Sequence, residues 1–172
     1  KNKIKNCYFN FLLFNFKEKK IKSKKKFDFI FYLRSHDNKG NNFILNLIKS
    51  LSKKKYKICV LGNKICLNKN IISVGKININ KAMKLISKSK YSIGSIENLY
   101  SFFVLDCLKY NLKVFVNKEF KIEKKIISSN KVIPIDFYNV KKSINKIENS
   151  IKLKNKKLNI TKNLNFNNYF RK

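Results

Sequence analysis

The sequence predicts an α/β fold in which helices cover both faces of a doubly wound, Rossmann-like parallel sheet. Short apolar segments alternate along the chain with segments whose apolar residues recur every three or four positions, as βαβ units require. The strand-like segments are apolar almost throughout, which is typical of strands that are buried on both faces. Polar or glycine-containing turns separate the two kinds of segment.

Each element follows from its own pattern. The first predicted strand, 27–33, is rich in aromatic residues, which favour strands. The helix after it carries apolar residues on one face between positions 43 and 51. The remaining predicted strands are 56–61, 71–74, 91–96, 113–116 and 131–135. The remaining predicted helices are 82–86, 102–108, 119–129 and 140–151.

We expect three parts along the chain. Residues 1–26 are interpreted as a linker or the end of a preceding domain, because a charged run of lysines ends at Lys26. Residues 27–152 form the α/β domain, and residues 153–172 form an asparagine-rich tail. Because the first residue is Lys1 and not Met, we expect the chain to be a piece of a longer protein.

The net charge of +32 says little about partners. A strongly basic chain normally indicates nucleic acid or an anionic membrane, but these lysines are spread through all the predicted elements. Lys, Asn and Ile make up about half of the chain, and their AT-rich codons point to genome composition. Of the 41 basic residues, only Arg34 and Arg171 are Arg, although Arg suits bidentate phosphate binding better than Lys. We therefore expect no nucleic-acid partner.

Cysteine and histidine usage excludes several kinds of site. The four cysteines form no Cys-x-x-Cys pair and His36 is the only histidine, so we expect neither a metal site nor a disulfide framework. Cys59 and Cys107 lie in apolar segments and are interpreted as buried small hydrophobes. No segment has the length of a membrane-spanning helix. We expect a cytoplasmic protein.

Candidate binding residues follow the strands, where the ligands of open α/β sheets bind. Arg34 and Lys39 lie five residues apart on one turn, at a spacing that allows both to converge on a diphosphate. The amides at the helix start near Leu99, Tyr100 and Ser101 would add a second anion site. This edge of the sheet is therefore the predicted location of the chemistry.

Two glycines and two acids complete the candidate set. Gly62 and Gly75 follow the next two strands, where they either end the strand or allow close approach to a base. Glu97 and Asp106 supply acceptors suited to sugar or ribose hydroxyls. Neither Gly-x-Gly-x-x-Gly nor a P-loop motif is present, so those two phosphate cradles are excluded.

This constellation resembles the carboxyl-terminal, nucleotide-sugar-binding domain of retaining glycosyltransferases with the GT-B fold, of the family-four type. The resemblance covers about residues 27–152, and the order of the elements matches as well. It rests on the segments 34–40 (RSHDNKG), 60–62 (VLG), 73–75 (SVG) and 97–106.

The resemblance implies a role for each residue. Arg34 and Lys39 would bind the donor diphosphate, and Glu97, the first acid of a Glu-x-x-x-x-x-x-x-Glu motif, would act at the transferred sugar as the catalytic residue. The second acid of the motif would hold the ribose hydroxyls. Here the eighth position after Glu97 is Leu105, and the acid arrives one residue later as Asp106.

These residues also have plainer interpretations. The two cations of the turn fit a solvated surface, Glu97 fits an acid that favours the helix dipole, and Asp106 fits an ion pair with a nearby lysine. Phe102 and Phe103 are expected in the core.

The resemblance implies the donor-binding half of a glycosyltransferase. It would transfer a hexose from a nucleotide diphosphate sugar to a saccharide or lipid-linked acceptor, without a metal or other cofactor. The amino-terminal acceptor domain would be missing, and residues 1–26 would be its remnant. An envelope or lipid-linked acceptor implies polysaccharide biosynthesis and peripheral contact with the inner face of a membrane. Two alternatives remain: a non-enzymatic basic α/β module that binds RNA or the ribosome, and a degenerate domain that binds without turnover.

Overall fold

The computed structural model describes residues 24–34, 41–96, 101–122, 127 and 130–153. Strands and helices alternate along the chain. The strands are β1 (Phe27–Leu33), β2 (Ile58–Gly62), β3 (Ile71–Gly75), β4 (Ser89–Ile93), β5 (Lys113–Asn117) and β6 (Val132–Ile135). The helices are α1 (Asn41–Lys53), α2 (Ile79–Ser87), α3 (Phe102–Lys109) and α5 (Val140–Lys152).

The strands form one parallel sheet with the order β3-β2-β1-β4-β5-β6. From the central strand β1 the chain moves outward to β2 and β3, and then returns to the other side of β1 to form β4, β5 and β6. The strand order therefore reverses between β1 and β4, which is where ligands bind in open α/β sheets. The predicted Rossmann-like, doubly wound fold class is confirmed.

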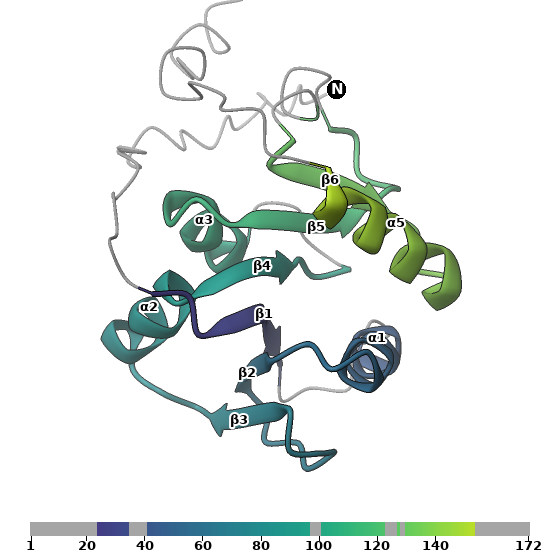
Figure 1. The fold of residues 1–172 in the computed structure, drawn as a ribbon. Coiled ribbons are helices and arrows are strands. Elements are labelled where there is room, and N and C mark those ends of the chain that lie inside the picture. The colour runs from purple at the N-terminus through teal and green to yellow at the C-terminus, as the bar shows by residue number, and fades with distance from the viewer. Residues whose placement is uncertain (1–23, 35–40, 97–100, 123–126, 128–129, 154–172) are drawn as a thin grey trace, which may run out of the picture.

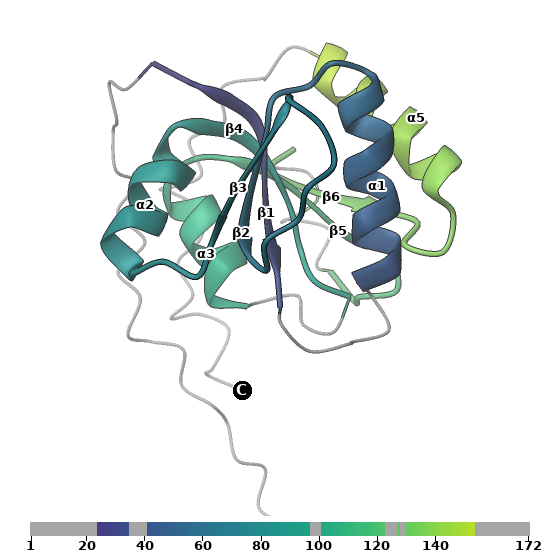
Figure 2. The ribbon, with the colours of Figure 1, turned by 90° about the horizontal axis from the view of Figure 1, so that it is seen from below.

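Helices cover both faces of the sheet (Figures 1 and 2). Helices α1 and α5 lie on one face and α2 and α3 on the other. Because successive side chains of a strand point to opposite faces, β1 contributes to both cores. Phe29 and Phe31 pack with α1 and α5, and Ile30 packs with α2 and α3. The core on the α1 and α5 face includes Leu47, Ile48, Leu51, Ile144 and Ile147. The core on the α2 and α3 face includes Cys59, Ile86, Val104, Cys107 and Val114.

Several predicted boundaries move by one to three residues in the structure, and one predicted helix begins elsewhere. Strand β4 ends at Ile93 instead of residue 96; the Gly94 amide still donates a hydrogen bond to the Phe115 carbonyl (2.7 Å), but residues 94–96 are not part of the strand. The helix predicted for 119–129 does not begin at Glu119. The Asn117 side chain accepts the Glu119 amide (3.3 Å) and holds the chain in a turn. Of the rest of that prediction, only Phe120–Ile122 and Ile127 are described, and Ile127 is helical.

The cysteine interpretation is confirmed and one aromatic prediction is wrong. Cys59 and Cys107 are buried, and burial raises the pKa of each thiol to about 12. Phe103 is partly buried as expected, but Phe102 is 74% exposed. The buried residues of α3 are Val104, Leu105 and Cys107. At 100° per residue Val104 and Cys107 lie about 160° and about 140° around the helix from Phe102, which therefore points away from the side that these two residues bury.

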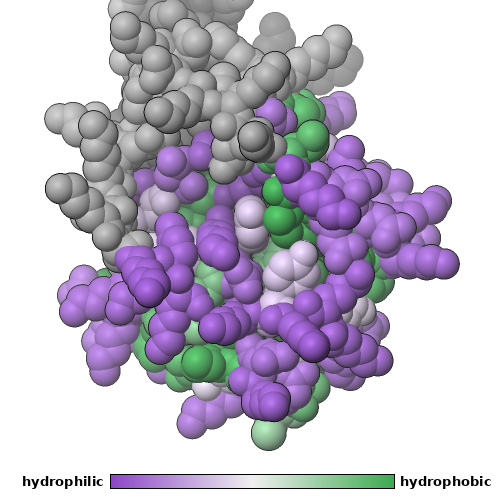
Figure 3. All heavy atoms as spheres, in the orientation of Figure 1, coloured by the Kyte–Doolittle hydropathy of each residue, from purple (hydrophilic) through white to green (hydrophobic). Residues whose placement is uncertain are grey.

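The surface matches the dispersed lysines of the sequence. Figure 3 shows hydrophilic residues over most of the described part of the visible face, with hydrophobic residues showing between them. No helix within the described ranges combines the length and apolarity that crossing a membrane requires.

Candidate functional site

The turn after β2 fixes the end of the central strand β1. Arg34 follows β1 directly and is exposed. Its carbonyl oxygen accepts a hydrogen bond from the Asn63 side-chain amide (2.9 Å). The Asn63 backbone amide donates to the Leu33 carbonyl (2.9 Å). The structure thus holds Arg34 at the carboxyl edge of the sheet, beside the strand-order reversal.

Gly62 allows the ends of β1 and β2 to approach closely. Its φ is +91°, a conformation that L-residues with side chains rarely adopt. A Cβ atom at this position would lie 1.9 Å from the Leu33 carbonyl oxygen and 3.2 Å from a ring carbon of Tyr32. The packing of the protein itself therefore requires glycine here, whether or not a base also approaches.

Gly75 occupies the corresponding position on the edge strand. Its φ is +71°, and an added Cβ would lie 3.1 Å from the flexible side chain of Lys64. Ser73 on the same strand ties this edge to β2, because its hydroxyl donates to the Asn63 carbonyl (3.3 Å) and accepts the Ile65 amide (2.9 Å). Gly75 thus lies two strands away from Arg34 in the sheet.

The first turn of α3 lies against the end of β1. Ser101 caps the helix, and its hydroxyl accepts the Val104 amide (3.3 Å). The Phe103 ring contacts the Tyr32 ring, with 5.8 Å between the centroids. This ring contact brings the first turn of α3 and the end of β1 together.

Asp106 differs from the acids that stabilise the fold. Asp28, Asp136 and Glu148 each form an ion pair with a lysine, at 2.8–3.0 Å. Asp106 lies five residues after the α3 cap and is half-buried. Burial raises the pKa of its carboxyl group, and the charge of Lys109 offsets only part of this rise. The fold therefore carries an electrostatic cost at Asp106.

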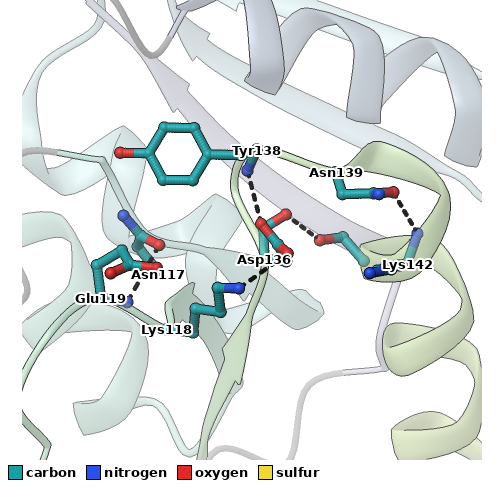
Figure 4. A network of polar contacts seen from close by, with 8 residues as sticks. Asn117, Lys118, Glu119, Asp136, Tyr138, Asn139 and Lys142 are labelled. Carbon is teal, nitrogen blue, oxygen red and sulfur yellow. Dashed lines mark hydrogen bonds and ion pairs between the residues drawn. The ribbon is translucent and has the colours of Figure 1, made fainter.

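Sequence reasoning missed a polar network at the ends of β5 and β6 (Figure 4). Lys118 and Asp136 form an ion pair (3.0 Å), the Tyr138 amide donates to the Asp136 carboxylate (3.0 Å), and the Ser143 hydroxyl donates to the Asp136 carbonyl (2.6 Å). The Lys118 ammonium and the Tyr138 amide lower the pKa of Asp136. The sequence pattern that could have indicated this network is an acid, Asp136, directly after a predicted strand, followed three residues later by Asn139, which caps α5.

The rest of the predicted site is only partly described. Lys39, Glu97, Leu99 and Tyr100 lie outside the described residues. Within the described residues, no group of three or more His, Cys, Asp or Glu side chains is arranged to hold a metal ion.

The architecture is that of the Rossmann-like domains of GT-B proteins. A UDP-GlcNAc 2-epimerase from Methanocaldococcus jannaschii, solved with UDP-GlcNAc and UDP, superimposes with a TM-score of 0.58 at 12% identity, over 77% of this chain and 40% of that one. The E. coli heptosyltransferase WaaC, solved with ADP-2-deoxy-2-fluoro heptose, gives 0.50 at 8% identity, over 80% and 46%. The pneumococcal O-GlcNAc transferase GtfA, solved with UDP and GlcNAc, gives 0.51 at 14% identity, over 75% and 28%.

At these identities the likeness establishes the fold. The chain spans less than half the length of each of these three proteins. No family model matches the sequence, and no curated protein matches it either.

Proposed function

We propose that this chain is the donor-binding part of a glycosyltransferase, which binds a nucleotide diphosphate sugar at the carboxyl edge of the sheet. The observation that carries the proposal is the convergence of Arg34, the Gly62 turn and the capped start of α3 around the end of β1, at the point where the strand order reverses. The fold is shared with proteins solved with UDP-GlcNAc, UDP and an ADP-heptose analogue, which supports the same ligand class.

The chemistry follows from where charge develops. When the bond between the anomeric carbon and the diphosphate breaks, negative charge grows on the departing diphosphate. In our proposal Arg34 and Lys39 stabilise that charge, because guanidinium and ammonium groups form charge-assisted hydrogen bonds with phosphate oxygens. Glu97 acts at the transferred sugar and Asp106 holds the ribose hydroxyls. Retention of configuration and the acceptor domain rest on the family resemblance.

The electrostatic cost of half-burying the Asp106 carboxylate supports a functional role for that acid. Its carboxyl group is half-buried with a raised pKa, whereas Asp28 and Asp136 lie in ion pairs with lysines. Groups kept in unfavourable electrostatic surroundings are over-represented at functional sites. We therefore keep the assignment of Asp106 to the ribose hydroxyls, although Asp106 lies one residue beyond the spacing of the family motif.

Calorimetry on the full chain tests the proposal. We expect binding of at least one nucleoside diphosphate sugar in a series of uridine, guanosine and adenosine donors. Arg34→Ala is expected to weaken that binding about tenfold or more, because hydrogen bonds to charged groups contribute about 1.5–3 kcal/mol. Lys57→Ala is the matched control, because Lys57 is an exposed cation directly before β2, at the opposite edge of the sheet.

Two results would contradict the proposal. One is the absence of binding to every donor in the series together with no effect of Arg34→Ala. The other is binding to RNA with a steep loss of affinity as salt rises, which is the signature of a nucleic-acid binder.

A further inference from the structure

The side chain of Tyr32 lies exposed at the carboxyl end of the central strand. It is 49% exposed, while the neighbouring side chains of Phe31 and Leu33 are buried. No other residue of β1 is exposed. A large ring in water at the strand-order reversal is unexpected for a strand that otherwise belongs to the core.

Two neighbours hold the Tyr32 ring in position. On one side lies Phe103 of α3, with 5.8 Å between the ring centroids and 34° between the ring planes. On another side lies the backbone of β2, since an added Cβ at Gly62 would be 3.2 Å from a Tyr32 ring carbon. A ring that is held in this way loses little conformational freedom when a flat ligand stacks on it.

The positions of Tyr32 and Arg34 fit the two ends of one nucleotide. They are two residues apart, which corresponds to about 7 Å of extended chain. In the proposed function Arg34 binds the diphosphate, and Asp106, on the helix that carries Phe103, binds the ribose. A nucleoside diphosphate joins its base to its phosphates through the ribose, so the remaining part of the ligand is the base. A base is flat and aromatic, which suits the exposed face of a tyrosine ring.

We propose that Tyr32, positioned by Phe103, is the surface on which the nucleobase of the donor stacks. This inference rests on the proposed function. It adds a residue that contributes affinity for the base and not for the phosphates or the transferred sugar.

Calorimetry with two probes separates the base from the phosphates. The full chain is titrated with UDP and with inorganic pyrophosphate, and the variants are Tyr32→Ala, Tyr32→Leu and Tyr32→Phe. Stacking on an aromatic side chain contributes about 1–3 kcal/mol per base, so Tyr32→Ala and Tyr32→Leu are expected to weaken UDP binding about 5- to 150-fold. Both should bind pyrophosphate as the wild type does, and Tyr32→Phe should bind UDP within about threefold of the wild type.

The Leu variant guards against loss of folding, because it keeps an apolar side chain against Phe103 and Gly62. Tyr138→Ala is the matched control, since Tyr138 is 73% exposed and follows β6 at the far side of the sheet. Thermal melts of each variant report whether it is folded.

Each outcome decides one of the two proposals. If wild-type protein binds UDP and Tyr32→Leu binds it equally well, stacking on Tyr32 is refuted and donor binding stands. If Tyr32→Leu weakens UDP and pyrophosphate equally, Tyr32 only supports the site and the stacking assignment is refuted. If the wild type binds neither UDP nor any other nucleoside diphosphate, the proposed function fails and the base-stacking assignment fails with it.

Discussion

Replacing the glycines at the carboxyl ends of the strands by alanine tests the geometry of the site directly. Gly62 has a φ of +91°, and its Cβ would lie 1.9 Å from the Leu33 carbonyl oxygen. The left-handed conformation costs an alanine about 1–2 kcal/mol. The clash involves a backbone oxygen, so β1 and β2 must separate, and the hydrogen bond from Asn63 to that oxygen is lost at about 1 kcal/mol. We expect Gly62→Ala to lower the free energy of unfolding by about 2–4 kcal/mol, a large share of the roughly 5–15 kcal/mol of a typical domain.

Alanine substitutions at two other glycines give loss-of-stability values with which that of Gly62→Ala can be compared. Gly75 has a φ of +71°, but its Cβ would contact only the Lys64 side chain, which can move. Gly75→Ala is therefore expected to cost about 1–2 kcal/mol. At Gly94 the nearest atoms to an added Cβ lie 3.4 Å away, in ordinary contact. Gly94→Ala should change stability by less than about 1 kcal/mol.

Urea denaturation followed by circular dichroism measures the three values. The reasoning requires the order Gly62, Gly75, Gly94, from most to least destabilising. If Gly62→Ala were as stable as the wild type, or if Gly94→Ala were the most damaging, the close approach of β1 and β2 would be refuted.

Five further substitutions test Asp106 and Ser101 at α3, Asp28 on β1 and Asp136 after β6. Asp106→Asn is expected to raise the melting temperature near pH 7, because it removes a carboxylate whose pKa is raised by burial. This gain in melting temperature should vanish well below the ordinary carboxyl pKa, where Asp106 is neutral. The control Asp28→Asn should lower the melting temperature, because it breaks the ion pair with Lys90. Asp136→Asn should destabilise the protein near pH 7 but not in strong acid. The pKa of Asp136 is lower in the folded than in the unfolded protein, so the carboxylate stabilises the fold above its unfolded pKa, and this contribution is lost as the pH falls through its folded pKa. Equal melting curves for this variant and the wild type at both pH values would contradict the prediction. Ser101→Ala should lower the free energy of unfolding by about 1 kcal/mol, because the α3 cap is lost. Ser101→Asp should keep the stability but weaken UDP binding, because it adds negative charge beside the diphosphate. Unchanged UDP affinity in Ser101→Asp would place the diphosphate elsewhere.

The sequence predicted the fold because its strongest signals are local. Apolar strands alternating with helical periods require a parallel sheet with helices on both faces, and the order of the elements then follows. The missed boundaries were decided by single polar contacts. The Asn117 side chain turns the chain at Glu119, where the pattern alone favours a helix. Composition does not reveal which of several competing local hydrogen bonds will form.

The location of the candidate residues in the fold depends on topology, whereas their surroundings depend on packing. Arg34, Gly62 and Ser101 were expected at one edge because the carboxyl ends of parallel strands share it, and their binding roles stay predictions. The exposure of Tyr32 and Phe102 was not predictable, since an aromatic residue in an apolar segment is normally buried. The ion pair between Lys118 and Asp136 joins residues 18 positions apart, and only the register of β5 and β6 brings them into contact.

The central claim is that a nucleotide binds at the carboxyl edge of the sheet, around the end of β1. Amide chemical-shift mapping of the full chain upon addition of UDP tests it most directly. We predict the largest shifts at Gly62, Asn63 and Ser101, with little change at Lys57 and Ser89 at the opposite edge. Shifts concentrated at the Lys57 and Ser89 edge, or spread over the exposed lysines and abolished by moderate salt, would contradict it.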